Sequence, residues 1–232
     1  MEFPFARAFV TRLAHVRLDS ASLASVALLA IGGTLGGLLP DAPMTRVERP
    51  TIVAVASAVA SRPPAELTLR YDFEYQPNFY YCGPASTRIA LSAQGYTLDQ
   101  DDLARRLGTT VNGTDSSHDI ARVLNDVVGR DTYQVREIPG PTATPAEMDR
   151  LQADVVRSLT AGRVIVANIV GGATDNSGYW RDYPGGHYVT IVGYADEGRQ
   201  VQVADPSGVG PHTYWISTID MATWMAGRGY AH

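Results

Sequence analysis

Lysine is absent from this 232-residue chain, and all 19 basic residues are arginine. Mechanisms that need a lysine amine, such as a Schiff base or a Ser-Lys dyad, are therefore excluded. The 24 acidic residues give a net charge of -5 and there is no basic cluster, so we expect no nucleic-acid partner. Because lysine codons are A-rich, this usage favours a G+C-rich bacterial genome.

Cysteine is almost absent as well, since Cys82 is the single one in the sequence. One cysteine can form neither an intrachain disulfide nor a cysteine-rich zinc site. The chemistry of this one thiol therefore becomes the main question.

Aromatic residues are missing between Val10 and Arg70, which disfavours a packed core there. Arginines precede an apolar run at 23–39, a pattern typical of an export signal, and the run is also about as long as the shortest spanning helices, roughly 17 residues. We therefore interpret residues 1–40 as an export signal or an uncleaved membrane anchor, with a buried core helix as the less favoured alternative. The predicted location is secreted or extracytoplasmic, with membrane attachment through this segment left open.

A proline-rich stretch follows, which we interpret as a linker over residues 41–67. The remaining residues, 68–232, are numerous enough for one domain with a single core.

The spacing of the hydrophobic residues changes partway through this domain, from a helical to a strand pattern. Helical spacing predicts helices at 82–95, 97–108, 118–128 and 145–159, the second and fourth opened by capping boxes. Short β-branched runs then predict strands at 164–170, 188–194, 201–204 and 213–216. Helices followed by antiparallel strands predict an α+β fold.

Cys82 lies at the start of the first predicted helix, directly before Gly83 and Pro84. Free N–H groups and the helix dipole there favour an anion, so we expect the pKa of the thiol to be lowered. The alternative is an inert buried cysteine.

A nucleophilic cysteine needs a base, and His187 is the best candidate because it follows Pro184-Gly185-Gly186 and opens a predicted strand. His118 is expected to cap a helix, His212 to lie in a loop, and the terminal His232 to fray.

Asp205 ends the next predicted strand, so antiparallel pairing would place it beside His187, where it could orient the imidazole. An Asp-Pro turn is the simpler reading of this residue. Gln76, six residues before Cys82, could supply an amide N–H to an oxyanion, together with the backbone N–H of Cys82.

The ordered set Gln76, Cys82-Gly83-Pro84, His187 and Asp205-Pro206 resembles the papain-like cysteine peptidases. It is most similar to the bacteriocin-processing, double-glycine-leader type and its exported single-domain relatives (peptidase family C thirty-nine). The resemblance implies a papain-like fold over about residues 70–230. It also implies that Gln76 lines the oxyanion hole, Cys82 attacks, His187 is the base and Asp205 orients it. Peptide or protein substrates are implied, and no metal or organic cofactor.

Two rival functions remain open. An acyl or peptidyl transferase would use the same site with an amine in place of water, and a non-catalytic peptide-binding domain would leave Cys82 unreactive. A loop over the cleft is expected to contain Asn168, Gly171-Gly172, Tyr179, Trp180 and Tyr183. Its aromatic side chains would either bind peptide or make ordinary packing contacts.

Overall fold

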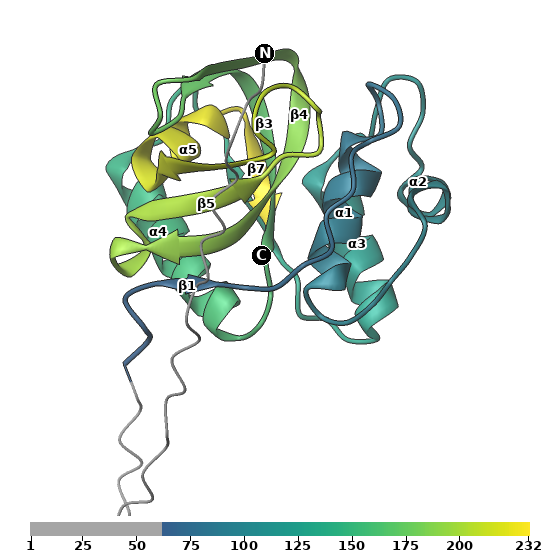
Figure 1. Ribbon diagram of the computed structural model, residues 1–232, viewed down its shortest axis with the longest axis horizontal. Helices are drawn as coiled ribbons and strands as arrows, with labels where there is room; N and C mark the ends of the chain where they lie inside the picture. Colours follow the sequence, from purple (N-terminus) through teal and green to yellow (C-terminus); the bar gives the residue numbers. More distant parts are fainter. Residues whose placement is uncertain (1–61) are drawn as a thin grey trace, which may run out of the picture. The chain divides into compact units, whose positions relative to one another are not determined.

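A seven-stranded antiparallel sheet with helices on both faces forms the framework of the protein in the computed structural model, which describes residues 62–232 (Figure 1). The expected signal or anchor, 1–40, and most of the expected linker lie outside the described residues. Within residues 62–232, no helix is both long enough and apolar enough to cross a membrane.

The first half of the described chain is mainly helical. It contains α1 (Cys82–Ser92), α2 (Gln100–Leu107) and α3 (Ser117–Val128). The capping box expected at Thr97 is wrong, because Asp99 caps α2 by accepting a hydrogen bond from the backbone N–H of Asp101. Helix α4 (Pro145–Thr160) does begin with a complete capping box, formed by Thr144 and Glu147. These caps satisfy N–H groups that a helix start otherwise leaves free.

The sheet is built mainly from the second half, in the spatial order β2-β7-β3-β4-β5-β6, with the short β1 paired to β4. Helix α5 (Thr218–Trp224) and the 3-10 turn η1 (Asp196–Gly198) complete the domain. The strands are β1 (Leu67–Thr68), β2 (Val135–Ile138), β3 (Ile165–Thr174), β4 (Trp180–Ala195), β5 (Gln200–Ala204), β6 (Thr213–Ser217) and β7 (Arg228–Ala231). The α+β expectation is confirmed, with Cys82 at the first helix start.

Each face of the sheet packs on its own group of helices. Val164 and Val166 belong to the apolar cluster of α1, α2 and α3, whereas Ile165 and Ala167 belong to that of α4 and α5. Alternate residues of a strand point to opposite faces, so a continuous apolar run is what a strand covered on both faces requires. Figure 1 shows α1 and α3 on one side of the sheet and α4 and α5 on the other.

Residues just before 68, the expected start of the domain, also make contacts with the sheet. The carbonyl of Pro64 accepts a hydrogen bond from the Tyr194 hydroxyl at 2.9 Å, and Leu67 pairs with Tyr194 in the sheet. The carbonyl of Ala65 accepts from the N–H of Glu197 at 2.9 Å. The end of the expected linker is therefore part of the folded domain.

Two further expectations are wrong, and part of the sheet was missed. His232 does not fray: it is buried, and its backbone exchanges hydrogen bonds of 2.9 and 3.0 Å with Gln134. Strands β2 and β7, which pair with each other, were not expected. Much of the expected loop between Asn168 and Tyr183 is instead a hairpin, in which Gly171 pairs with Tyr183 and Thr174 with Trp180.

Candidate active site

Cys82 begins α1, and its neighbours explain how the thiol is held there. Tyr81 occupies the N-cap position without a side-chain hydrogen bond to the helix, so the first turn keeps free N–H groups. Gly83 lies against Thr114, because a Cβ atom built on it would approach the Thr114 hydroxyl to 2.3 Å. Glycine is therefore required for the start of α1 to pack this closely on the loop that holds Thr114.

His187 lies within β4, directly after an irregular stretch of the strand. Ile169 pairs with His187 but Gly171 pairs with Tyr183, so extra residues bulge from β4 between these two pairs. Gly186, in this bulge, has a φ of 92°, a conformation that favours glycine. The expectation that His187 opens a strand is wrong in detail, since β4 starts at Trp180.

Asp205 follows β5 and faces His187 as antiparallel pairing required. Thr190 pairs with Ala204, which brings the next residue beside the part of β4 that carries His187. The imidazole Nε2 of His187 donates to the Asp205 carboxylate at 2.8 Å. The same carboxylate accepts from the Tyr183 hydroxyl at 2.7 Å and from the backbone N–H of Ser207 at 2.9 Å.

The three candidate residues are all buried, with exposed fractions of 7 % for Cys82, 4 % for His187 and 1 % for Asp205. Burial raises the pKa of the thiol, but a hydrogen bond with His187, its charge, and the backbone N–H groups of Tyr188 and Gly83 outweigh burial and lower it. Burial likewise lowers the pKa of His187, yet hydrogen bonds with Asp205 and Cys82 raise it to about 9. Burial raises the pKa of Asp205, while His187, Ser207 and Tyr183 bring it below its usual value. The arrangement favours a thiolate, an imidazolium and a carboxylate in series.

Gln76 is not joined to these three by its side chain. Its amide nitrogen donates to the carbonyl of Asn78 at 2.8 Å, and its amide oxygen is buried without a hydrogen-bond partner. Its backbone N–H donates to the carbonyl of Pro206 at 3.0 Å, which ties the loop before Cys82 to the residue after Asp205. The backbone of Gln76 is thus anchored at the site, whereas its side-chain amide N–H donates to Asn78.

A cleft of about 290 Å³ opens beside Cys82 and His187. A second hollow of about 370 Å³ adjoins it, because Asp115, Asn168 and Arg228 line both. Together they make a groove that runs from the thiol between the start of α3 and β7. A larger hollow of about 760 Å³ lies along α4 and contains none of the candidate residues, so size alone does not locate the site.

Several residues of the site carry no sequence signal of that role. Tyr183 stacks on the His187 ring with centroids 4.1 Å apart and also donates to Asp205. Asn168 donates to the Tyr188 hydroxyl, which in turn donates to the carbonyl of Thr114 at 3.3 Å. Both Tyr183 and Asn168 stood out in the sequence only as parts of an expected loop.

His118 and His212 make contacts other than with Cys82. His118 is exposed and pairs with Glu137 at 3.2 Å, and His212 packs on the Phe73 ring with centroids 4.4 Å apart. Residues 62–232 contain no group of three or more histidine, cysteine or carboxylate side chains placed to hold a metal ion.

The chain belongs to a family of cysteine peptidases. The model of the Peptidase_C39 like family matches residues 68–229, which is well over half of this chain. No curated protein is similar to the chain in sequence. The resemblance noted from Gln76, Cys82, His187 and Asp205 is thereby confirmed at the level of the family.

Among solved structures, the chain is similar to the peptidase domain of Streptococcus ComA, a bifunctional ABC transporter involved in quorum sensing. Identity is 14 %, coverage is 69 % of this chain and 96 % of that one, and the TM-score is 0.46. A double glycine motif protease from an AMS/PCAT transporter, solved with its leader peptide, is 12 % identical, with coverage of 70 % and 91 % and a TM-score of 0.43. Bromelain from Ananas comosus is 10 % identical, with coverage of 73 % and 98 % and a TM-score of 0.42.

Proposed function

We propose that this protein hydrolyses peptide bonds with Cys82 as nucleophile, His187 as acid and base, and Asp205 as the group that orients His187. The observation that carries the proposal is the position of His187, which lines the same cleft as Cys82 and donates to Asp205 at 2.8 Å. A nucleophile, a base and an orienting group in series are what nucleophilic acyl transfer needs.

In the first step the Cys82 thiolate adds to the carbonyl carbon of the substrate, and the carbonyl oxygen becomes an oxyanion. The free N–H of Cys82 at the helix start is the donor best placed for this oxygen. The imidazolium of His187 then protonates the leaving amine, which leaves a thioester on Cys82. Water, deprotonated by His187, attacks the thioester and restores the thiolate and the imidazolium.

Gln76 remains a proposed second oxyanion donor. Because its amide nitrogen donates to Asn78, the side chain would have to turn toward the cleft when substrate binds. The unpartnered buried amide oxygen supports such a change, since the present orientation leaves a polar atom unsatisfied.

The substrate is a peptide segment in extended form, which the adjoining hollows beside Cys82 would accommodate. The proposal also includes export, which rests on the composition of residues 1–40. Sequencing the N-terminus of the protein recovered from outside the cell would separate a cleaved signal from a retained anchor.

A peptide library incubated with the full chain tests the function. Mass spectrometry should find new termini with the wild type and none with Cys82→Ala. Addition of a free amine separates hydrolysis from transfer, because a transferase would join that amine to the acyl product. If wild type and Cys82→Ala leave the library equally intact, the catalytic proposal is wrong and a binding role gains support.

A further inference from the structure

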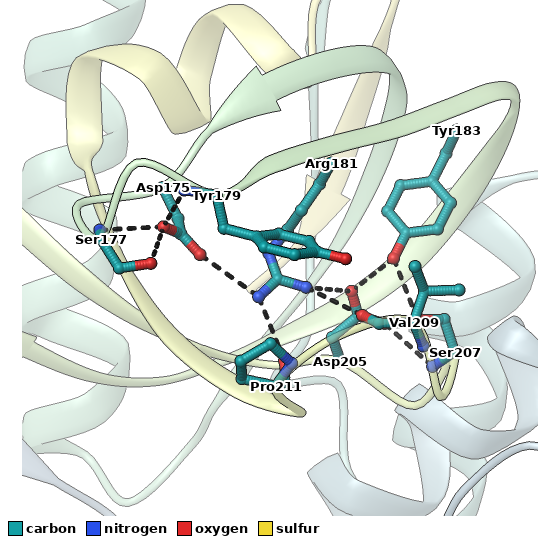
Figure 2. Close-up of polar contacts among 9 residues, drawn as sticks. All are labelled: Asp175, Ser177, Tyr179, Arg181, Tyr183, Asp205, Ser207, Val209 and Pro211. Carbon is teal, nitrogen blue, oxygen red and sulfur yellow. Dashed lines mark hydrogen bonds and ion pairs between the residues drawn. The ribbon is translucent and has the colours of Figure 1, made fainter.

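Arg181 is a buried arginine in β4 that lies behind the candidate site, and only 1 % of its surface is exposed. Figure 2 shows its guanidinium between two carboxylates, Asp175 on one side and Asp205 on the other. The Nη2 atom donates to Asp175 at 3.2 Å, and Nη1 lies 3.9 Å from the Asp205 carboxylate. Both carboxylate side chains are only 1 % exposed.

The guanidinium is also fixed by uncharged groups. It donates to the carbonyls of Val209 and Pro211, each at 3.1 Å, and it lies 3.6 Å above the Tyr214 ring and 4.9 Å from that of Tyr179. These contacts hold the loop after Asp205 and the turn of the β3–β4 hairpin to one side chain. A cation held from so many directions has little freedom to move away from Asp205.

Burying an ionised group is costly unless an opposite charge compensates it. Here the compensation continues from residue to residue: Asp175, Arg181, Asp205, His187 and Cys82 carry alternating charges when the thiol is ionised. Without Arg181, two buried carboxylates would remain on this side of His187 with no cation between them.

We propose that Arg181 is a positioning residue for the Cys82–His187 pair, which acts by keeping Asp205 ionised and turned toward His187. The inference rests on the proposed function, and it adds Asp175 and Arg181 as the far end of a buried row of charges. Arg181 does not touch the thiol or a substrate. Its effect reaches Cys82 only through Asp205 and His187.

The other titratable groups that face Asp205 are His187, Tyr183 and Tyr214. Burial and then the Asp205 charge raise the pKa of Tyr183 and of Tyr214, so both remain neutral phenols. Within the described residues, Arg181 and protonated His187 are thus the cations next to this carboxylate. If Arg181 is removed, a proton on Asp205 becomes the simplest compensation, and a neutral Asp205 stabilises imidazolium less well.

The test uses the full chain and the rate at which iodoacetamide alkylates Cys82 as a function of pH. The background is Asp175→Asn, so that the variant that also lacks Arg181 loses one carboxylate together with the cation and keeps no unpaired carboxylate at position 175. Asp175→Asn alone should not raise the pH of half-maximal alkylation. Adding Arg181→Met should raise that pH by about one unit, or about tenfold in rate on the acid side. Arg181→Lys, which keeps the charge, should stay closer to the wild type.

If Arg181 had a merely structural role, its removal would lower the alkylation rate at every pH and leave the pH of half-maximal alkylation unchanged. In an Asp205→Asn background, Arg181→Met should have little further effect on the pH of half-maximal alkylation, because Arg181 acts on Cys82 through Asp205. An unchanged midpoint in the folded Asp175→Asn/Arg181→Met variant would overturn the inference. If instead the wild-type thiol reacts no faster than a free thiol at acidic pH, it is the proposed function that fails.

A second measurement leaves Arg181 in place and covers the case in which its variants do not fold. In His187→Ala, Arg181 is the remaining cation beside Asp205. The carboxyl carbon signal of Asp205, assigned by its loss in Asp205→Asn, should report an ionised group down to about pH 5. Protonation of Asp205 above about pH 6 in this variant would show that Arg181 does not keep it ionised.

Discussion

Ser86 and Tyr188 join the helix that carries Cys82 to the strand that carries His187. The Ser86 hydroxyl donates to the carbonyl of Tyr188 at 2.9 Å, and the Thr190 hydroxyl donates back to the carbonyl of Ser86 at 3.1 Å. Ser86 lies about one turn after Cys82, and Tyr188 follows His187 directly. Two buried hydrogen bonds therefore fix the relative position of the thiol and the imidazole.

Ser86→Ala should disturb this alignment. We expect a loss of about 1–3 kcal/mol in unfolding free energy, because buried polar groups lose their partners, together with slower alkylation of Cys82. Ser92→Ala is the control, since the Ser92 hydroxyl donates to Ile89 within the same helix and accepts from the backbone N–H of Asp72, so it makes no bond to β4. Denaturant unfolding and iodoacetamide rates should separate the two variants. Equal alkylation rates in both would contradict a positioning role for Ser86.

Turnover and alkylation should respond differently to alkaline pH. Because the pKa of His187 is raised to about 9, the imidazolium is present below that pH and is lost as the pH rises through it. Turnover should then fall, since no acid remains to protonate the leaving amine. The thiolate persists, so alkylation should not fall. Measuring turnover and alkylation from neutral pH to about pH 10 tests this prediction. A parallel decline of the two rates would argue against His187 as the acid.

Gln76→Ala should separate oxyanion stabilisation from thiol activation. Turnover should fall by about 100-fold or more, as for the loss of one oxyanion donor, while alkylation stays nearly unchanged. The backbone hydrogen bond between Gln76 and Pro206 does not depend on the side chain, so the loop should keep its anchor. An alkylation rate that drops as strongly as turnover would mean that Gln76 shapes the loop before Cys82 instead.

Gly83→Ala should strain the start of α1. The added methyl group would overlap Thr114, and relieving this contact should cost about 1–3 kcal/mol of stability and displace the thiol. Gly185→Ala is the control, because a Cβ atom there meets no other atom within 4 Å. Thermal unfolding and alkylation should both be impaired by the first change. A Gly83→Ala protein as stable and reactive as the control would show that the close approach is not needed.

The N-terminal boundary of the domain can be tested by truncation. A chain that begins at Arg62 keeps the hydrogen bond from Tyr194 to Pro64 and the pairing of β1 with β4, whereas one that begins at Leu69 loses both. We expect the shorter chain to melt at a lower temperature. Equal melting temperatures would support the boundary at residue 68 that the sequence indicated.

Local patterns were sufficient for several features of this protein. A lone cysteine before Gly83-Pro84 marked a helix start, and helical and β-branched periods predicted helices α1 to α4 and strands β3 to β6. A strand followed closely by its antiparallel neighbour predicted that Asp205 would face His187, which the 2.8 Å hydrogen bond shows. These features depend on contacts between residues close in sequence, where propensity and pairing rules apply.

The tertiary structure decided what depends on distant segments. The pairing of β2 with β7, the burial of His232 and the stacking of Tyr183 on His187 have no local signal, because each is fixed by packing. Arg181 is the strongest case. No local pattern in the sequence singled out Arg181, and only the meeting of the β3–β4 turn with the loop after Asp205 buries it between two carboxylates. Burial removes the water that would otherwise screen these charges, so the fold, rather than the composition, makes Arg181 important to the site.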